Sequence, residues 1–445
     1  MRRFAVSVLA GLIAAVSIRS AAAAPPQPYV VKPGATCDGY PRLQIGMTKG
    51  MCAGLVVAPE PGRFAQRQVR MPRALLPLAN GDWLVADLGV WGSSTGAVWW
   101  LTAPPGKAPV LRRLLSRLVL PHGFARGPDG RVYVGEMTRI FRFDPDAADP
   151  AATVEVVAPG LPENTLHDNR HPLSAILFDG DGALIVNVGA ASDQCADARG
   201  RRNGTTRCAE AAGGATAALR RYAYLGAGRW ADTPTVLASG LRNSVALARH
   251  PSGLIVQGEN SIDFDDPHEP YDELNLIRPG GFYGWPYCYD ADRATPLWAG
   301  AFVCAGTEHA KPALLLPPHV APITMAYYQG AMFPQFRGHL LMTWRGFRAP
   351  GARVVAYRTD ARGLPVPAKA ARYPVYLPNG RVGRRPFRAG AGPAAEPVVL
   401  TTGWDLRAGI RPRGAPVGLA VAPDGAIWVT DDKNGAIVRL AVDRP

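Results

Sequence analysis

The stretch LPHGFARGPDGRVYVGE, from Leu120 to Glu136, decides the fold of this chain. Its central Asp-Gly pair suits a tight turn, because both residue types tolerate the positive φ angles that such turns need. Apolar and β-branched residues lie on either side of the turn, in the arrangement that strands favour. The stretch therefore predicts a β-hairpin.

Five further stretches repeat this pattern of entry, turn and strand. They are MPRALLPLANGDWLVAD from Met71, HPLSAILFDGDGALIVNVG from His171, LRNSVALARHPSGLIVQGEN from Leu241, APITMAYYQGAMFPQFRGHLLMTW from Ala321 and APVGLAVAPDGAIWVTDD from Ala415. Second hairpin patterns, such as GAVWWL and TRIFRFD, follow these copies. Two hairpins make a four-stranded antiparallel sheet whose two apolar faces need stacked neighbours. Six copies predict an all-β, six-bladed propeller over residues 69–445, with long loops on blades three to five.

Residues 1–24 have the pattern of a signal peptide. Arg2 and Arg3 precede an apolar stretch at residues 4–18, and the alanines at 21–24 suit cleavage. The alternative is a retained membrane anchor, but the apolar stretch is shorter than the roughly 20 residues that span a bilayer. No later segment of the sequence is long and apolar enough to span. We therefore predict a periplasmic or secreted protein without stable membrane insertion.

Six cysteines follow this segment, and an even number in an exported chain favours disulfides. Fifteen pairings are possible for six cysteines. Because the cysteines fall into three local couples, we expect Cys37–Cys52, Cys195–Cys208 and Cys288–Cys304. The first couple lies in residues 25–68, which we predict to be a disulfide-tied N-terminal extension.

The formal net charge of +14 allows several interpretations. Nucleic-acid binding is one, but the chain has no run of five basic residues, and export argues against a nucleic-acid partner. An arginine-rich solvated surface is the plainest interpretation. A third is that some arginines neutralise an acidic small ligand.

The entry of each predicted blade carries polar residues that should converge on the channel axis. These candidates are His122, His171, Arg242, Asn243 and His319, with Arg345 at the end of the fifth blade's strand. A neutral histidine can accept a proton from an alcohol, and arginines bind carboxylates through paired hydrogen bonds. Together they suit the oxidation of a hydroxyl group beside a polyanionic cofactor. The alternatives are structural histidines and an Arg-Asn pair that caps a strand end.

Residues 258–275 form an acidic, proline-bearing loop, in which six carboxylates crowd residues 263–273. Dense carboxylates together with main-chain carbonyls suit a hard cation such as Ca²⁺, although the spacing is not that of an EF-hand. A solvated acidic loop is the alternative. The chain has no Gly-rich dinucleotide motif between a strand and a helix, which disfavours NAD or ATP as cofactor.

Several of these stretches resemble one known superfamily. GLRNSVALARHPSGLIVQGENS (240–261) and DELNLIRPGGFYGWPYCY (272–289) resemble the soluble quinoprotein glucose dehydrogenases and sorbosone dehydrogenases. PPHVAPITMAYYQG (317–330) and FRGHLLMTWRG (336–346) are most similar to the sorbosone branch. The resemblance implies a propeller that holds pyrroloquinoline quinone (PQQ) and Ca²⁺ at its channel mouth. It also implies a sugar or aldehyde substrate and an electron acceptor that the sequence does not identify.

The resemblance assigns roles to residues of this chain. His171 matches the general base, Arg242 and Asn243 match residues that hold the cofactor, and Arg345 matches the family's cationic position. The carbonyl positions of the metal loop correspond to Ser261 and Ile262, with Asp263 beside them. His122 and His319 are further candidates for the cofactor site.

Three departures from the glucose enzymes are present. Arg170 stands where they carry an acid before the base, the metal loop lacks their Gly-Pro, and Ala415-Pro416-Val417 stands near the last blade in place of clamp arginines. Only Arg411 and Arg413 are close to that position. Two alternatives therefore stay open: a non-catalytic ligand-binding propeller, and a Ca²⁺-dependent lactonase. The lactonases hold their metal on the axis with Glu, Asn and Asp, so His and Arg at these places count against that function.

Overall fold

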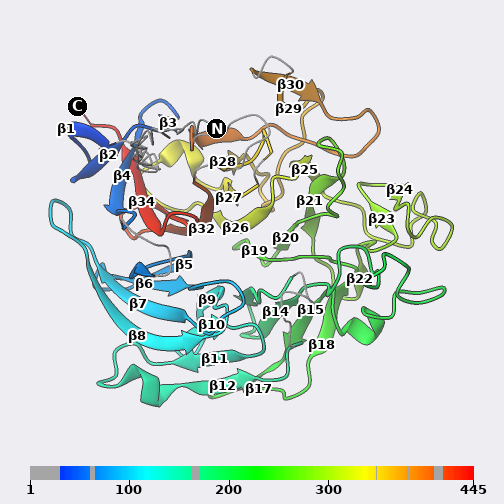
Figure 1. Ribbon diagram of the computed structural model, residues 1–445, viewed down its shortest axis with the longest axis horizontal. Helices are drawn as coiled ribbons and strands as arrows, with labels where there is room; N and C mark the ends of the chain where they lie inside the picture. The colour runs from blue at the N-terminus through cyan, green and yellow to red at the C-terminus, as the bar shows by residue number, and fades with distance from the viewer. Residues whose placement is uncertain are drawn as a thin grey trace, which may run out of the picture.

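The computed structural model describes residues 31–60, 66–162, 171–346, 348–377, 381–404 and 414–444. Their six larger β-sheets, of four to six strands each, stand side by side around a central axis (Figure 1), and this confirms the predicted six-bladed propeller. The predicted signal peptide and the residues Arg170, Arg411 and Arg413 lie outside the described part of the chain.

The first three blades use the sheet orders expected for antiparallel propeller blades. Blade one contains β5 (Pro72–Pro77), β6 (Trp83–Asp87), β7 (Gly96–Thr102) and β8 (Val110–Leu118). Blade two contains β9 (Gly123–Arg126), β10 (Val132–Gly135), β11 (Ile140–Phe143) and β12 (Glu155–Ala158). Blade three contains β13 (Ile176–Phe178), β14 (Leu184–Val188), β15 (Ala218–Tyr222) and β18 (Thr235–Ser239), with β22 (Gly281–Phe282) added in parallel to β18.

The last three blades continue the ring and carry the longer insertions. Blade four contains β19 (Ala246–Arg249), β20 (Ile255–Glu259), β21 (Tyr271–Leu276) and β25 (Leu314–Pro318). Blade five contains β26 (Pro322–Tyr327), β27 (Leu340–Trp344), β28 (Arg353–Tyr357) and β31 (Val398–Thr402), and β3 (Gly46–Met47) adds to its edge. Blade six contains β32 (Pro416–Val421), β33 (Ile427–Asp431) and β34 (Ala436–Val442), followed outward by β4 (Met51–Val57), β2 (Tyr40–Leu43) and β1 (Val31–Cys37).

Each repeated stretch forms the two innermost strands of its blade. In blade two, Gly123 pairs with Gly135, and Gly130 takes a φ of 80° in the turn that joins the strands. Gly123 also allows close packing between blades, because a Cβ atom there would lie 2.5 Å from the backbone oxygen of Ser174 in blade three. The turn chemistry and the small residues of the repeat therefore set both the hairpin and its approach to the axis.

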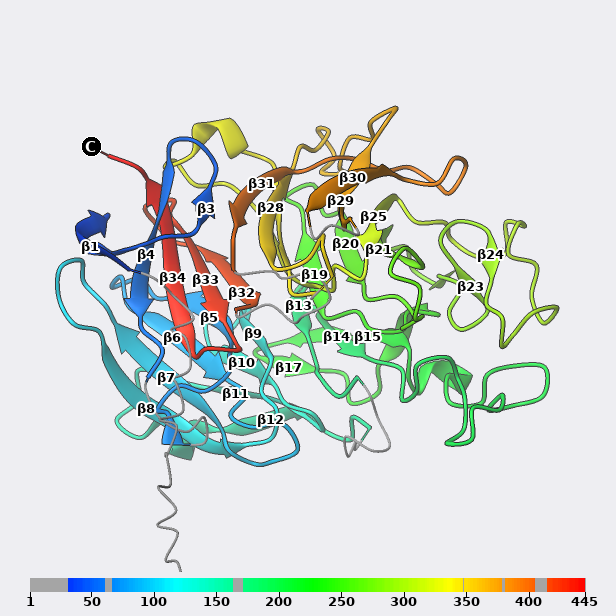
Figure 2. The same ribbon diagram turned by 45° about the horizontal axis from the view of Figure 1, so that its top comes forward.

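The N-terminal strands close the ring. Strand β4 pairs antiparallel with β34 along most of its length, and the two strands lie side by side in Figures 1 and 2. The Cys37–Cys52 disulfide joins β1 to β4 within the same sheet. We predicted residues 25–68 as an extension ahead of the propeller, and the strand pairing attaches residues 31–57 to blades five and six as their outer strands.

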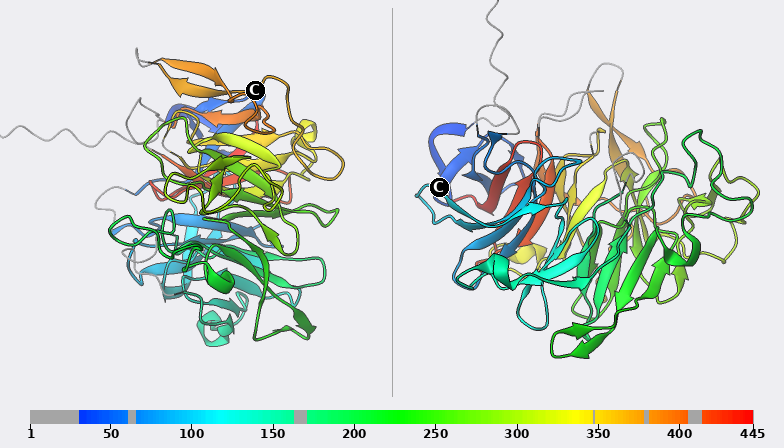
Figure 3. Two further views of the ribbon diagram at one scale, coloured as in Figure 1. Left: turned by 90° about the vertical axis from the view of Figure 1, so that its right-hand side faces the viewer. Right: turned by 60° about the horizontal axis from the view of Figure 1, so that its bottom comes forward.

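The hydrophobic core lies between neighbouring blades, and Figure 3 shows them packed as a fan of sheets. The rings of Trp83 in blade one and Trp428 in blade six stack with centroids 4.3 Å apart, so the first and last blades share a core.

All three predicted disulfides are present, at Cys37–Cys52, Cys195–Cys208 and Cys288–Cys304.

Smaller elements decorate the loops. The two-stranded ribbons are β16 (Tyr224–Gly226) with β17 (Arg229–Trp230), β23 (Cys288–Tyr289) with β24 (Arg293–Ala294), and β29 (Arg372–Tyr376) with β30 (Val382–Pro386). Single 3₁₀ turns occur at η2 (Pro150–Thr153), η3 (Ala212–Gly214) and η4 (Pro334–Phe336). Among the described residues, no helix has the length and apolar character needed to cross a membrane.

Candidate functional site

The starts of the six innermost strands meet at the axis. One apolar residue from each start joins a single buried cluster: Met71, Leu120, Leu173, Val245, Ile323 and Val417. His122, His171, Arg242 and His319 lie within four positions of these residues in the sequence. The repeat therefore brings the apolar starts of the six blades together at the axis, and the candidate polar residues follow or precede them closely in the sequence.

His171 is buried against blade three. Its Nδ1 lies 2.6 Å from the carbonyl oxygen of Ala190, which can only accept, so Nδ1 carries the proton. The acceptor lone pair of a neutral ring then belongs to Nε2. Gly189 backs onto this histidine, and a Cβ there would lie 2.5 Å from the Cβ of His171. The loop after β14 therefore fixes both the tautomer and the position of the imidazole.

Arg242 is adjacent to His171 through Ala190, whose N–H donates to the Arg242 carbonyl at 2.7 Å. Its side chain is 3% exposed, and each of its three guanidinium nitrogens makes a hydrogen bond. Nε donates to Asp193 at 2.8 Å, Nη1 to the Asn260 carbonyl at 2.9 Å, and Nη2 to Asp263 at 2.9 Å. One arginine thus ties the disulfide loop of blade three to the acidic loop of blade four, with two carboxylates around one cation.

Asn243 lies next to this contact. Its backbone N–H donates to Oε1 of Glu259 at 3.0 Å. The side-chain Oδ1 is buried and has no hydrogen-bond partner among the residues that the structure describes. A buried amide oxygen without a donor is costly, so this side chain is suited to receive one from a ligand.

Arg345 belongs to a different cluster on the axis. Its Nε donates to Oδ2 of Asp432 at 2.9 Å, and the buried Arg73 binds the same carboxylate oxygen. Burial lowers the pKa of Arg73 to about 10, and the attraction of Asp432 opposes that shift. Two arginines around one carboxylate leave a surplus positive charge, and Arg345 carries it toward solvent with 38% of its side chain exposed.

His122 joins this second cluster. Its Nδ1 accepts from Nε of Arg73 at 3.4 Å, and its ring also hydrogen-bonds the backbone of Val245. Burial lowers the pKa of His122 well below its usual value, and the charge of Arg73 adds to that effect. His122 is therefore a neutral partner of Arg73, and both line a channel cavity of about 360 Å³.

Among the described residues, no hydrogen bond joins His319 to either cluster. Its Nε2 donates to the carbonyl of Asp266 at 2.9 Å, on the acidic loop of blade four. The nearby Asp272 joins that loop to blade five, because its carboxylate accepts from the N–H groups of Ser261 and Ala321. Burial raises the pKa of Asp272, and the charge of His319 opposes the shift. His319 and Asp272 thus hold the loop of the predicted metal residues.

The three predicted metal residues have mixed surroundings. The Ser261 hydroxyl donates to the Tyr271 carbonyl at 2.7 Å, and the Ile262 carbonyl accepts from Phe264 N–H at 3.1 Å. The Asp263 carboxylate is paired with Arg242. Within the described ranges, no group of three or more His, Cys, Asp or Glu side chains is arranged to hold a metal ion.

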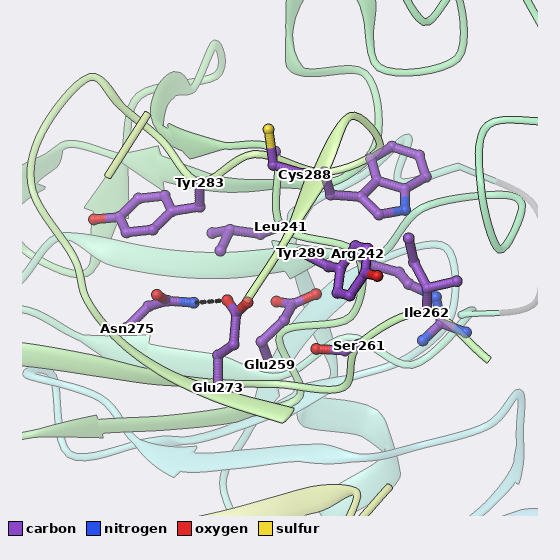
Figure 4. Close-up of a pocket in the computed structure, with 12 residues that line it drawn as sticks. Leu241, Arg242, Glu259, Ser261, Ile262, Glu273, Asn275, Tyr283, Cys288 and Tyr289 are labelled. Carbon is purple, nitrogen blue, oxygen red and sulfur yellow. Dashed lines mark hydrogen bonds between the residues drawn. The ribbon is translucent and has the colours of Figure 1, made fainter. Parts of the chain in front are cut away.

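A small acidic cavity lies directly behind this loop (Figure 4), with about 20 Å³ of space, enough for a water molecule. Glu259 and Glu273 point into it, and Asn275 donates to Glu273 at 3.2 Å. Burial raises the pKa of Glu259 to about 7, and it raises that of Glu273 well above its usual value, with the Glu259 charge adding to the second shift. Their carboxyl oxygens are the chemical type that hard cations prefer.

The sequence did not point to Arg73, Asp432 or Asp193. Arg73 lies in the entry of the first repeat, and Asp432 is the last residue of the sixth repeat. Their positions in the repeat could therefore have identified both residues. Asp193 lies in the loop between two strands of blade three, where no repeat places it. Only the fold brings it to Arg242.

Comparisons with solved structures give relatives of the same fold. A carbohydrate-active enzyme of family AA12 from Trichoderma reesei aligns with 19% identity and a TM-score of 0.66, over 90% of this chain and 98% of that one. The PQQ domain of a pyranose dehydrogenase from Coprinopsis cinerea, in its holo form, gives 19% identity and a TM-score of 0.63 over 92% and 100%. A PQQ-bound aldose sugar dehydrogenase from Streptomyces coelicolor gives 18% and 0.52 over 89% and 100%.

The match to a family profile identifies the family of this chain as well as its fold. No curated protein sequence matched the chain. The family profile described as Glucose / Sorbosone dehydrogenase matches residues 127–349, half of the chain, and this range includes His171, Arg242 and Arg345. With the propeller, its axial cluster and this match in place, the chain belongs to the glucose/sorbosone dehydrogenase family.

Proposed function

We propose that this protein is an exported, PQQ-dependent dehydrogenase that oxidises an aldose or a sorbosone-like aldehyde. Membership of the glucose/sorbosone dehydrogenase family supports the reaction class. Two solved structures of the same fold are described as holo or PQQ-bound forms, which supports the cofactor. The sorbosone-like substrate rests on the sequence resemblance of residues 317–346.

The side chains at the mouth fit an anionic quinone. PQQ is a tricarboxylate, and the Arg73–Asp432–Arg345 cluster carries one more positive than negative charge. The half-buried guanidinium of Arg345 offers donors for carboxylate and carbonyl oxygens, and the unpartnered Oδ1 of Asn243 offers an acceptor for an N–H group of the ligand. When bound, the quinone would supply the hydride acceptor. Arg345 and Asn243 would hold it, and Arg242 would orient the loops on either side.

His171 would act as the general base, and its hydrogen bond to Ala190 carries this part of the proposal. Because the Ala190 carbonyl fixes the proton on Nδ1, Nε2 is the atom that can take a proton from a sugar hydroxyl. Burial of the ring limits its rotation, so the lone pair keeps one direction. General-base catalysis of this kind contributes about 10²–10⁴-fold in rate.

Ca²⁺ is proposed at the loop of Ser261, Ile262 and Asp263. This loop offers backbone carbonyls, and Asp272 fixes the backbone of Ser261. The Asp263 carboxylate would have to exchange its arginine partner for the ion, since it is paired with Arg242. Oxygen donors of this kind are the ligands that Ca²⁺ takes in proteins.

The test is reconstitution of the purified protein with PQQ and Ca²⁺, followed by dye reduction over a panel of aldoses and aldehydes. We expect a change in the quinone absorption spectrum on binding, and turnover with at least one sugar. His171→Ala should keep the spectral change and lose about 10²–10⁴-fold in kcat, while the control His339→Ala should retain activity. Failure to bind PQQ would refute the proposal.

A non-catalytic ligand-binding propeller is the second candidate. The pairing of Arg242 with two carboxylates favours it, because Asp193 and Asp263 already compensate the charge of this arginine without a cofactor carboxylate. Quinone or sugar binding without turnover, unchanged by His171→Ala, would identify this function.

A further inference from the structure

The ribbon of β29 and β30 is an insertion that stands apart from the blades. It interrupts blade five between β28 and β31 and forms its own two-stranded sheet. Figures 1 and 2 show it projecting from the ring, in orange, on the side of β25 and β21. The ribbon is therefore a separate feature of the surface and contributes no strand to the propeller.

The base of this ribbon is held firmly against blade four. Tyr373 is buried in a small cluster with Tyr271, and their rings lie 6.1 Å apart. Arg388 donates its backbone N–H to the Tyr271 hydroxyl at 2.8 Å and its guanidinium to Asp290 at 2.9 Å. Because Tyr271 lies within the acidic stretch of residues 258–275, the ribbon is anchored beside the candidate mouth.

The insertion concentrates the positive charge of the chain. Residues 358–396 contain eight arginines and lysines and two acidic residues, which is a surplus of six of the chain's net +14. Arg372, Arg384 and Arg385 are exposed on the ribbon itself. One of the two acids, Glu396, pairs with Arg384. Less than a tenth of the chain thus carries over two fifths of its net charge.

Two exposed apolar side chains lie near the outer end of the same ribbon. Leu377 is 40% exposed and Val382 is 58% exposed, and both follow or begin a strand of the ribbon. Exposing large apolar side chains to water is unfavourable, and arginines beside them can bind phosphate groups. An apolar end flanked by arginines is typical of segments that lie in the headgroup layer of an anionic membrane.

We propose that the β29–β30 ribbon docks this protein on an anionic phospholipid surface. Leu377 and Val382 enter the headgroup layer, and Arg384 and Arg385 bind lipid phosphates. The contact is peripheral and reversible, so it agrees with a chain that lacks a spanning helix among its described residues. It places the anchored base of the ribbon, and with it the acidic loop at the mouth, close to the membrane.

A lipid surface fits the ribbon better than an acidic protein partner. Strands of five residues span only about 17 Å, and two of them offer a narrow edge. A stable protein interface needs about 800 Å² from each partner. A lipid surface needs no such area. Leu377 and Val382 can enter the headgroup layer, and the neighbouring arginines can bind phosphates, without a large buried interface.

The test is co-sedimentation of the full chain with vesicles of phosphatidylglycerol and phosphatidylcholine in equal parts. We expect binding that is lost in pure phosphatidylcholine and weakened by added salt. Arg384→Glu with Arg385→Glu should reduce the partition coefficient at least tenfold. Leu377→Ser with Val382→Ser should reduce it severalfold at unchanged charge. Free glycerol phosphate should not displace the protein, since it provides no surface.

A matched control removes the same charge elsewhere. Arg199→Glu with Arg207→Glu, on the exposed disulfide loop of blade three, should leave vesicle binding within twofold of the unaltered protein. All variants should melt within a few degrees of each other and keep any dye-linked activity, since none touches the mouth. Equal losses from both arginine pairs, or binding of soluble polyglutamate that the Leu377 and Val382 changes do not affect, would overturn the proposal.

Discussion

Arg242 and Arg345 are both arginines at the axial mouth, yet their surroundings are opposite in charge. Arg345 shares the single carboxylate of Asp432 with Arg73, so two cations surround one anion. Arg242 is held by Asp193 and Asp263, so two anions surround one cation. One side of the mouth therefore has a surplus of positive charge and the other a surplus of negative charge.

The resemblance assigned both arginines to the cofactor site, but their surroundings suit ligands of opposite charge. The side of Arg345 suits the carboxylates of an anionic cofactor. The side of Arg242 suits a cation, and it lies next to the acidic loop proposed for Ca²⁺. A tricarboxylate bound together with a divalent cation would match both sides at once, which is the pairing that the proposed function requires.

The largest expected effect comes from the carboxylate shared by two arginines. Asp432→Asn leaves the buried Arg73 without its counter-charge and should cost about 3–5 kcal/mol of unfolding free energy. Urea unfolding measures this. The matched control is Asp443→Asn, whose carboxylate pairs with Arg42 near the surface and should cost under about 1 kcal/mol. Equal costs for the two variants would show that the axial cluster is not a desolvated ion pair.

The next effect depends on pH, at the acidic cavity of Figure 4. Because burial raises the pKa of Glu259 to about 7, its neutral form stabilises the fold at low pH, and that contribution is lost as pH rises through about 7. We expect stability without metal to fall by up to about 3 kcal/mol between pH 5 and 8. Glu273→Gln removes a neighbouring carboxylate and should flatten this fall, while the exposed Glu308→Gln should not. A melting curve that does not change with pH would contradict this.

The partners of Arg242 should differ in cost because they differ in exposure. Asp193→Asn removes the better buried partner and should cost about 1–3 kcal/mol, since it weakens two hydrogen bonds to a buried cation. Thermal melting gives the stability change, and the quinone spectrum shows whether the mouth is disturbed as well. A neutral result would mean that Asn260 and Asp263 hold Arg242 without help.

The smallest stability effect is expected at Asp263, whose side chain is 67% exposed. Asp263→Asn should change stability by less than about 1 kcal/mol. It should also lower the affinity for Ca²⁺ severalfold, because the proposed metal loop loses a carboxylate oxygen. Titration with Ca²⁺ in the presence of PQQ measures this. An unchanged Ca²⁺ affinity would show that Asp263 is not a metal ligand.

The sequence predicted most of the fold because the propeller is built from local repeats. An Asp-Gly turn between apolar strands, as around Gly130, needs only neighbouring residues to form, and six copies predict the ring. The disulfides could be predicted for the same reason, since each closes a loop of 13 to 16 residues. The pairing of β4 with β34 joins distant residues, and no local pattern indicates it.

The candidate site was predictable only where repeat position controls geometry. His122, His171 and Arg242 follow from their place in the blade entries, and the apolar cluster around Leu173 confirms that the entries converge. Their partners were not predictable. Asp193 reaches Arg242 from a loop whose path depends on a disulfide and on the Trp285 indole, which donates to the Asp193 carbonyl at 2.9 Å.

The joining of the two chain ends in blade six has a consequence for how the protein is made. Val57 pairs with Ile437, so strand β4 has an open edge until β34 has been synthesised. An open edge strand invites wrong partners, including other copies of the same chain. Closure of the ring therefore depends on β34, and removing residues 436–445 should leave β4 unpaired on that edge and the core between blades six and one incomplete.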